Sequence, residues 1–483
     1  MIEKLKETGI YFIGTVGVAI FSFIISILYT RMFSTDDYGI YSLIAAFYNL
    51  IYQLLTGWMT HSILRYYPEE QKRDGSYIFR NTMLRIHIIL LFIFFLLIII
   101  AIIFYKQSLI VCTLLLIYLG VFVFEGLLLI FNTFLRAEGK SRQYSINTIF
   151  NSVVKSLSII ILFYLFKFTS IKVIVFSIFI SEFLLCLYVY FRYKWYKIIK
   201  KNCFDINLAR RVLIFGYPLI GVSVIFNILT YSDRYIIGFF GTNSDVGLYS
   251  YGYNMGYTLF YTLTNAIMLG AYPRITKEWN DNGRKSAERS VTNYLNLYFY
   301  LMIPCVFGIL AIGNKIIYCL CGSAYWNSSN VFIITCVSYT LYGLLQYTNK
   351  AWELTAKTKI ILNLNIVAAI LNIVLNILLI PQYGYVIAAY TTMFSFLIYI
   401  ILSLYLSKDI FNFIIDRITF FKILFASVGM FILIKLFDYY MNNSLLNICL
   451  EIFVGIVFYF FILIIFRDKN VSMIIKKIKE SRL

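Results

Sequence analysis

Glu125, Lys155 and Glu182 are ionisable residues inside long apolar stretches of the sequence. Each lies about ten residues, or roughly 15 Å of α-helix, from the more basic end of its stretch. The hydrocarbon layer of a bilayer is about 30 Å thick, so all three would lie near its middle. An uncompensated charge there costs at least about 2.5–3.5 kcal/mol. Two interpretations remain open: a Glu–Lys pair that holds helices together, or a cation at a substrate site beside carboxylates able to bind a coupling ion.

Polar residues recur at helical spacing in five of the apolar stretches. Asn147, Asn151 and Lys155 follow one another in steps of four, so they share one helix face. Lipid cannot satisfy amide groups, and such faces must therefore point away from it. Hydrogen bonds between helices, each worth about 0.6 kcal/mol on average, would explain one stripe, but stripes in several segments favour a shared hydrated cavity. The stripes are Asn49, Gln53, Thr56 and Thr60; Asn147, Asn151 and Lys155; Ser223, Asn227, Tyr231 and Arg234; Asn254, Thr258, Tyr261 and Asn265; and Asn365, Asn372 and Asn376.

The elements that carry these residues are predicted to be transmembrane helices. Hydrophobic residues make up 61% of the chain and charged residues 13%, against about 25% charged residues in soluble domains. The apolar runs have the length of about 20 residues that a membrane crossing needs. We therefore predict an all-α polytopic membrane protein with about fourteen transmembrane helices. The predicted spans are 9–30, 39–60, 82–104, 108–132, 145–166, 171–191, 212–231, 245–270, 290–312, 328–348, 359–380, 384–406, 419–437 and 445–466.

The basic residues predict the orientation of these spans. Of the 42 Lys and Arg residues, 34 lie in the two tails and in the loops on the same side, and 7 lie on the other side. By the positive-inside rule both termini are cytoplasmic. The net charge of +19 thus marks loops at a membrane, and no nucleic-acid partner is expected. The eight cysteines and two histidines lack ligand spacing, so we predict no metal site and no cofactor.

Three pairs of short motifs indicate an internal repeat. DYGIYS opens the second span and DVGLYS the eighth, YP closes the second and eighth spans, and LxAxxK follows the fourth and the tenth. The pattern predicts two six-helix lobes that run the same way through the membrane around a central cavity, plus two C-terminal helices. We place the N-terminal lobe at 1–200, the C-terminal lobe at 201–407, and the last two helices with a basic cytoplasmic tail at 408–483.

Several motifs, in order along the chain, resemble those of polysaccharide-repeat flippases. They are TRMFSTDDYGIY (30–41), RYYPE (65–69), FLRAEGK (134–140), FGYPL (215–219), DRYIIG (233–238) and VGLYS (246–250). The chain is similar to the Wzx-type branch, which includes O-antigen flippases, of the multidrug/oligosaccharidyl-lipid/polysaccharide exporter superfamily. The resemblance runs from about residue 8 to residue 400, and the last two helices fit the fourteen-helix members.

This resemblance implies a function and partners. It implies a transporter that moves undecaprenyl-pyrophosphate-linked oligosaccharide units from the cytoplasmic to the outer leaflet of the bacterial inner membrane, for cell-surface polysaccharide assembly. Membrane lipids, a polysaccharide polymerase and chain-length proteins are the further expected partners. Two rivals remain: a drug or cation antiporter of the same superfamily, and a membrane-embedded glycosyltransferase. The short external loops disfavour the enzyme.

A pyrophosphate-linked substrate would need cations in a space of low dielectric constant. Lys155 is the first candidate, because it is the only cation predicted in mid-membrane and it extends the stripe of Asn147 and Asn151. Three arginines and one more amide are the other predicted substrate contacts: Arg234, Arg31, Arg65 and Asn227. Each arginine could instead extend toward lipid headgroups. Glu125 and Glu182 would either hold Lys155 in place or bind the proton or sodium ion that resets the carrier.

Overall fold

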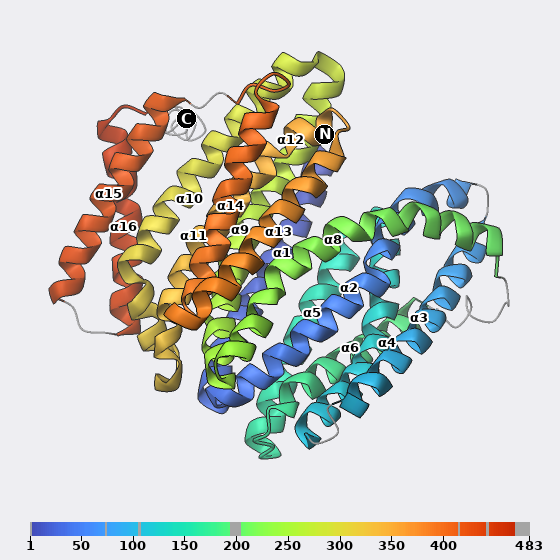
Figure 1. Cartoon of the computed structure of the whole chain (residues 1–483). Coiled ribbons are helices and arrows are strands. Elements are labelled where there is room, and N and C mark those ends of the chain that lie inside the picture. Colours follow the sequence, from blue (N-terminus) through green and yellow to red (C-terminus); the bar gives the residue numbers. More distant parts are fainter. Residues whose placement is uncertain are drawn as a thin grey trace. The chain divides into compact units, whose positions relative to one another are not determined.

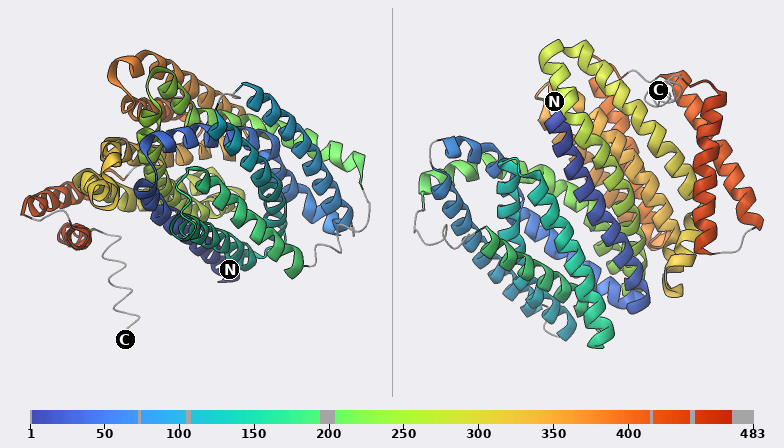
Figure 2. Two further views of the ribbon diagram at one scale, coloured as in Figure 1. Left: turned by 90° about the horizontal axis from the view of Figure 1, so that it is seen from below. Right: turned by 180° about the vertical axis from the view of Figure 1, so that it is seen from behind.

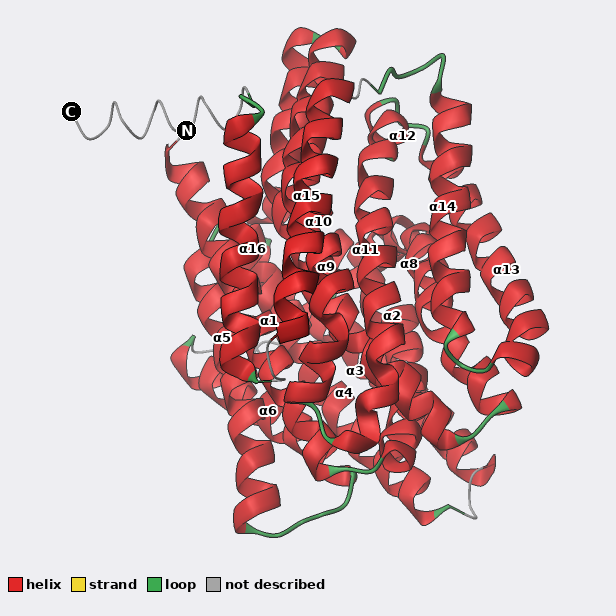
Figure 3. Cartoon of the chain, turned by 90° about the vertical axis from the view of Figure 1, so that its left-hand side faces the viewer, coloured by secondary structure: helices red, strands yellow, loops and turns green. Residues whose placement is uncertain are grey.

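The computed structural model describes residues 2–72, 75–104, 108–193, 204–413, 416–440 and 444–468 (Figure 1). The predicted basic tail beyond residue 468 lies outside these residues. All regular structure in the described ranges is helical (Figure 3).

Fourteen of the described helices have 20 residues or more, and three further elements are short. The long helices are α1 (Ile2–Met32), α2 (Thr35–Lys72), α3 (Ser76–Phe104), α4 (Leu109–Ala137), α5 (Ser141–Ile160), α6 (Lys172–Arg192), α8 (Ile206–Phe240), α9 (Asn243–Asn282), α10 (Arg284–Leu320), α11 (Ser329–Thr348), α13 (Thr358–Tyr383), α14 (Ile387–Ser407), α15 (Arg417–Tyr440) and α16 (Leu445–Ile465). The short ones are η1 (Ile161–Leu165), η2 (Ser323–Ser328) and α12 (Lys350–Leu354).

These helices agree with the predicted membrane spans. Twelve of them are long and apolar enough to cross a membrane by length and composition. The remaining two, α8 and α9, have 35 and 40 residues and match the seventh and eighth predicted spans. At about 1.5 Å per residue both are long enough to span a bilayer. The all-α polytopic fold is therefore confirmed.

Several helices extend well beyond the predicted spans. The second span was expected at 39–60, but α2 runs to Lys72, and α9 continues nine residues past Pro273. The YP pairs thus lie inside helices and do not close them. Hydropathy reports only the part of a helix that lies in hydrocarbon, whereas the backbone hydrogen bonds continue into the polar region. A second difference is in the fifth span, expected as one helix over 145–166: α5 ends at Ile160 and a π-helical turn, η1, follows it.

The helices group into two compact units. The first comprises residues 1–250 and 373–385, and the second comprises 251–372 and 386–483. Two helices, α9 and α13, are thereby divided between the units. The predicted lobe boundaries at 200 and 407 were derived from the repeat and stay predictions.

In the first unit α2 is the central helix. It packs against α8, α4 and α3, while α1 packs against α5 and α4 against α6 (Figure 1). Toward the C-terminal end of α2, a core of large apolar side chains joins α2, α3 and α4. Its fully or almost fully buried members include Trp58, Met59, Ile63, Tyr67, Phe79, Met83, Phe131 and Phe134.

In the second unit α10 packs against α11, α15 and α16, and α11 packs against α14. The α15–α16 pair forms a hairpin that can be followed in Figure 2. One face of α16 is buried at steps of three or four residues, through Ile448, Glu451, Gly455, Tyr459 and Leu463. Its other face exposes large apolar side chains, including Leu446, Phe453, Val457 and Phe461. An apolar outer face is what a lipid-facing helix requires.

Candidate functional site

A polar cavity of about 330 Å³ lies within the first unit, a volume at the lower end of the range for ligand pockets. Five helices supply its walls: α1, α2, α4, α5 and α6. Each of the five contributes at least one polar side chain, although the surrounding helices are apolar. The lining residues are Val18, Ser22, Ile25, Tyr41, Ala45, Tyr48, Asn49, Tyr118, Val121, Glu125, Asn151, Ser152, Lys155, Ser156, Ile178 and Glu182.

Both carboxylates of the cavity are held by hydrogen bonds. The hydroxyl of Tyr48 on α2 donates to Oε2 of Glu125 on α4. Nδ2 of Asn151 on α5 donates to Oε1 of Glu182 on α6 at 2.8 Å. Each bond joins two helices, so the carboxylates are fixed in position at the wall.

Lys155 lies in the same wall without a close partner. Among the described residues it forms no hydrogen bond or ion pair, although Glu125 and Glu182 line the same cavity. The structure therefore shows no direct Glu–Lys salt bridge of the kind that one interpretation required. Its ammonium group is available to an anionic group that enters the cavity.

Tyrosine rings form the α2–α4 side of the cavity. The rings of Tyr48 and Tyr118 are stacked with centroids 4.3 Å apart and an interplanar angle of 23°. Tyr48 also contacts Tyr52 and Phe94. This packing limits the rotamers of Tyr48, whose hydroxyl positions Glu125.

The structure brings four of the nine predicted site residues together: Lys155, Asn151, Glu125 and Glu182 all line the cavity. Asn147 lies one turn from Asn151 on α5, is fully buried, and donates to Oδ1 of Asn132 on α4 at 3.1 Å.

The other four predicted residues lie elsewhere. Asn227 donates to the carbonyl of Ser223 in its own helix at 2.8 Å. Arg234 is buried on α8 with its guanidinium 4.8 Å from the ring centre of Tyr231. Arg31 is exposed at the end of α1, and Arg65 is exposed and pairs with Glu69 at 3.2 Å. None of the four lines the cavity, and their substrate roles stay predictions.

The sequence interpretation missed the tyrosines. Tyr118 precedes Glu125 by seven residues, which places both on one helix face, so this signal was readable. Tyr48 and Tyr41 lie on α2, which is separated from α4 in the sequence, and nothing in the spacing indicated which face of α2 meets Glu125.

A second buried polar network joins α8, α9 and α13 in the first unit. Asp233 is fully buried and accepts hydrogen bonds from Nδ2 of Asn376 at 2.7 Å and from the hydroxyl of Tyr249. The sequence interpretation used Asp233 only as part of a family motif. Within the described ranges, no three His, Cys, Asp or Glu side chains gather closely enough to hold a metal ion.

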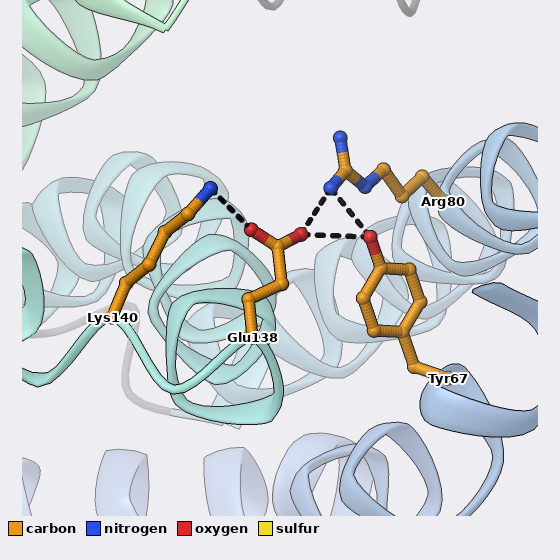
Figure 4. A network of polar contacts seen from close by, with 4 residues as sticks. All are labelled: Tyr67, Arg80, Glu138 and Lys140. Carbon is orange, nitrogen blue, oxygen red and sulfur yellow. Dashed lines mark hydrogen bonds and ion pairs between the residues drawn. The ribbon is translucent and has the colours of Figure 1, made fainter. Parts of the chain in front are cut away.

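A third network closes the end of α4 (Figure 4). Glu138 accepts hydrogen bonds from Tyr67 at 2.8 Å and Lys140 at 2.7 Å, and it pairs with Arg80. Burial raises the pKa of the Glu138 carboxyl, but the hydrogen bonds from Lys140 and Tyr67 and the charges of Arg80 and Lys140 outweigh burial, so the pKa lies below its ordinary value. The network ties the FLRAEGK motif to α2 and α3. Its role is structural, and none of its residues lines the cavity.

Apolar helices around a walled polar cavity are the arrangement that a membrane transporter needs. The chain belongs to the family described as polysaccharide biosynthesis protein, whose model matches residues 4–279, more than half of the chain. A second family model, MatE, matches residues 218–378. The predicted superfamily and the predicted class, a transporter, are confirmed.

Two curated relatives come from the archaeon Haloferax volcanii. The probable low-salt glycan biosynthesis flippase Agl15 is 25% identical over 230 residues, which is 47% of this chain and 48% of that protein. The probable flippase AglR is 28% identical over 170 residues, 34% of each protein. The chain thus matches about half the length or less of these relatives.

Solved structures share the fold. The lipid II flippase MurJ in an inward closed conformation superposes with a TM-score of 0.77 at 19% identity, covering 95% of this chain and 99% of MurJ. A multidrug resistance MATE family transporter in an inward-facing conformation gives 0.65 at 11% identity, covering 81% and 94%. Identities this low establish the fold alone.

Proposed function

We propose that this protein is a flippase that moves undecaprenyl-pyrophosphate-linked oligosaccharide units from the cytoplasmic to the outer leaflet, for cell-surface polysaccharide assembly. It would act in the bacterial cytoplasmic membrane with both termini cytoplasmic. The observation that carries the proposal is the cavity, which places the unpaired Lys155 among amides and hydroxyls inside an apolar bundle. The family match and the names of the two relatives support the same substrate class.

In the proposed mechanism the glycan head crosses in the polar cavity while the polyprenyl tail stays in lipid. Lys155 meets the pyrophosphate, and Asn151 and the serines of α5 meet hydroxyl groups. Alternating access exposes the cavity first to one side and then to the other. Glu125 or Glu182 takes up the proton or sodium ion that resets the carrier, because a carboxylate that gains a cation no longer repels the incoming anion.

The test of this function uses the chain's own gene in a deletion strain. Lipid-linked repeat units exposed at the outer surface are measured with a lectin or antibody, and membrane levels of each variant are matched. We expect Lys155→Met to lose most of the export and Lys155→Arg to keep part of it. Lys172→Met is the matched control, because Lys172 lies at the start of α6, where it bonds Thr113 at 3.2 Å outside the cavity. Full export by Lys155→Met would remove Lys155 from the site.

The double variant Glu125→Gln with Lys155→Met separates two roles for the carboxylate. If Glu125 only balances Lys155, the double variant exports more than either single variant. If Lys155 meets the substrate, the double variant stays inactive. Export measured against external pH and sodium, with Glu125→Gln and Glu182→Gln, identifies the coupling ion.

The MatE match over residues 218–378 and the MATE-like fold favour a second candidate, a drug or cation antiporter. Such a protein would leave repeat units exposed in the deletion strain, and the deletion strain would accumulate a cationic dye.

A further inference from the structure

Three tyrosine rings of α9 follow one another in steps of four residues within the second unit. The rings of Tyr257 and Tyr261 are stacked, with centroids 4.6 Å apart and an interplanar angle of 18°, and Tyr253 lies almost parallel to Tyr257 at 6.5 Å. Tyr339 on α11 packs edge-on against all three rings, with centroid distances of 5.9, 4.9 and 6.0 Å. These contacts fix the orientation of the stack.

The stack ends at Tyr261, beside a pair of amide side chains. The next residue on this face of α9 is Asn265, whose Oδ1 accepts a hydrogen bond from Nε2 of Gln346 on α11 at 3.2 Å. The ring of Tyr342 on α11 lies 5.7 Å from that of Tyr261, tilted by 37°. Rings and amides from two helices are thus neighbours. We call them the tyrosine–amide surface, which consists of Tyr257, Tyr261, Tyr342, Asn265 and Gln346.

The tyrosine–amide surface is open on one side. Its five residues are half-buried, whereas Tyr253 and Tyr339, which pack against its rings, are buried. Hydrocarbon cannot satisfy amide groups, so the open side must face a polar space and not lipid. The surface is therefore accessible to a polar ligand inside the bundle.

Neutral amides beside aromatic rings suit a sugar better than a charged ligand. The C–H bonds on one side of a pyranose ring are polarised positive and are attracted to the negative face of an aromatic ring. Sugar hydroxyls both donate and accept hydrogen bonds, as amide side chains do. A drug cation would also be attracted by the ring faces, but none of the five side chains is a carboxylate that would balance its charge.

We propose that the tyrosine–amide surface is the subsite for the sugar rings of the transported glycan. The inference rests on the proposed flippase function and deepens it. Lys155 in the first unit binds the pyrophosphate, which every substrate of this class carries, and the second unit recognises the uncharged sugars, which differ between substrates. Affinity for the glycan and affinity for the lipid pyrophosphate are therefore separable by mutation.

The first test measures the two affinities separately. Purified protein in nanodiscs is titrated with the lipid-linked repeat unit extracted from the deletion strain, and with undecaprenyl pyrophosphate that carries no sugar. Tyr261→Leu should weaken binding of the repeat unit about two- to tenfold, the factor expected for one aromatic contact, and leave binding of the sugar-free lipid unchanged. Lys155→Met should weaken binding of both. Tyr342→Leu should repeat the result of Tyr261→Leu without disturbing the stack on α9.

Two variants serve as controls for this titration. Tyr261→Phe keeps the ring and should bind the repeat unit almost as the parent does. Tyr318 on α10 forms a ring pair with Trp326 at 5.3 Å, outside the tyrosine–amide surface. Tyr318→Leu therefore also removes one aromatic contact from the second unit, and it should bind both probes with the parent affinity.

The second test captures the glycan on the surface. The photoreactive residue p-benzoylphenylalanine replaces Tyr342, or Tyr318 as the control, in cells that make the polysaccharide. After irradiation the purified protein is probed with a lectin that recognises the repeat unit. We expect a lectin-positive adduct at position 342 and none at position 318.

Three outcomes overturn the sugar subsite. One is parent affinity for the repeat unit in folded Tyr261→Leu and Tyr342→Leu. Another is an equal loss for both lipid probes, which would make the rings structural elements. The third is lost binding of the cation tetraphenylphosphonium with glycan binding unchanged, which would assign the rings to a drug cation.

The proposed function fails in a different way. A parent protein that binds neither the repeat unit nor undecaprenyl pyrophosphate would overturn the flippase function, and with it the subsite. A parent protein that binds both lipids with equal affinity overturns the subsite alone, because the sugars would then contribute nothing to binding.

Discussion

Lys315 on α10 holds the last two helices through a buried ionic cluster. Its Nζ lies 2.5 Å from Oε1 of Glu451 on α16 and 2.9 Å from Oδ1 of Asp438 on α15. The side chain of Lys315 is 4% exposed and that of Glu451 is not exposed at all. The second oxygen of Glu451, Oε2, is buried with no hydrogen-bond partner among the described residues. The lysine therefore carries most of the compensation for this carboxylate.

Lys315→Met should destabilise the protein by about 3–5 kcal/mol, the usual cost of leaving one partner of a buried ion pair uncompensated. The double variant Lys315→Met with Glu451→Leu removes both charges and should recover most of the loss, because apolar replacements of a buried pair are often neutral or stabilising. Lys435→Met is the matched control. Lys435 is 45% exposed and lies 3.8 Å from Asp438, and an exposed pair of this kind is worth about 0–1 kcal/mol.

The assay is reversible unfolding of the purified protein in mixed micelles, followed by tryptophan fluorescence, with limited proteolysis to show whether α15 and α16 detach first. A loss of under about 1 kcal/mol for Lys315→Met, equal to the loss for Lys435→Met, would refute the argument. A double variant no more stable than Lys315→Met would also refute it, since it would show that the lysine side chain acts by packing and not by charge.

Three further predictions concern the helix ends and one close contact. Because the pKa of Glu138 is lowered in the folded protein, its stabilising effect is full above the unfolded pKa of about 4.3 and is lost as pH falls through the folded pKa. Glu138→Gln should therefore make the melting temperature fall less steeply as the pH is lowered. An unchanged dependence of the melting temperature on acidic pH would contradict this. Ala356 follows α12 with a positive φ of 57°, so Ala356→Gly should raise the stability by about 0.5–1 kcal/mol. Gly139 has a φ of 70°, so Gly139→Ala should lower the stability by about 1 kcal/mol. Thermal unfolding in detergent measures both changes, and opposite signs would show that the backbone strain is absent. Gly126→Ala should cost about 1–3 kcal/mol, because its Cβ would lie 2.0 Å from a buried histidine ring, whereas Gly308→Ala meets nothing within 4 Å and should cost nothing in the same assay.

The sequence was sufficient for the number and order of the long helices because each needs an apolar run to cross lipid. Their ends were harder to predict. The ninth span was expected to end at residue 312, but α10 continues to Leu320. Lys315, interpreted as a loop charge, is consequently a buried helix residue. Hydropathy cannot distinguish a lysine that leaves the membrane from one that is neutralised by carboxylates from α15 and α16, far along the chain.

The cavity could be predicted in part for a geometric reason. Glu125, Lys155 and Glu182 were predicted at equal depth in three consecutive helices, and short connections keep consecutive helices close. The partners of these residues depend on helix rotation and on neighbours distant in sequence. Tyr48, which donates to Glu125, is 77 residues away in the sequence. No pattern in either helix predicts that contact.

The two repeats have similar sequences at the starts of α2 and α9, but equivalent side chains there make different contacts. Tyr41 and Tyr249 hold the same place in the two repeated segments, yet Tyr41 lines the cavity and Tyr249 donates to the buried Asp233. Gly39 and Gly247 also hold equivalent places, and a Cβ added to either would collide with a backbone carbonyl of the other segment. The proposed anionic substrate needs no such symmetry, and each further cation in the membrane would have to be compensated whenever the cavity is empty. Lys155, the lysine predicted in mid-membrane, belongs to the first repeat as the sequence delimits it.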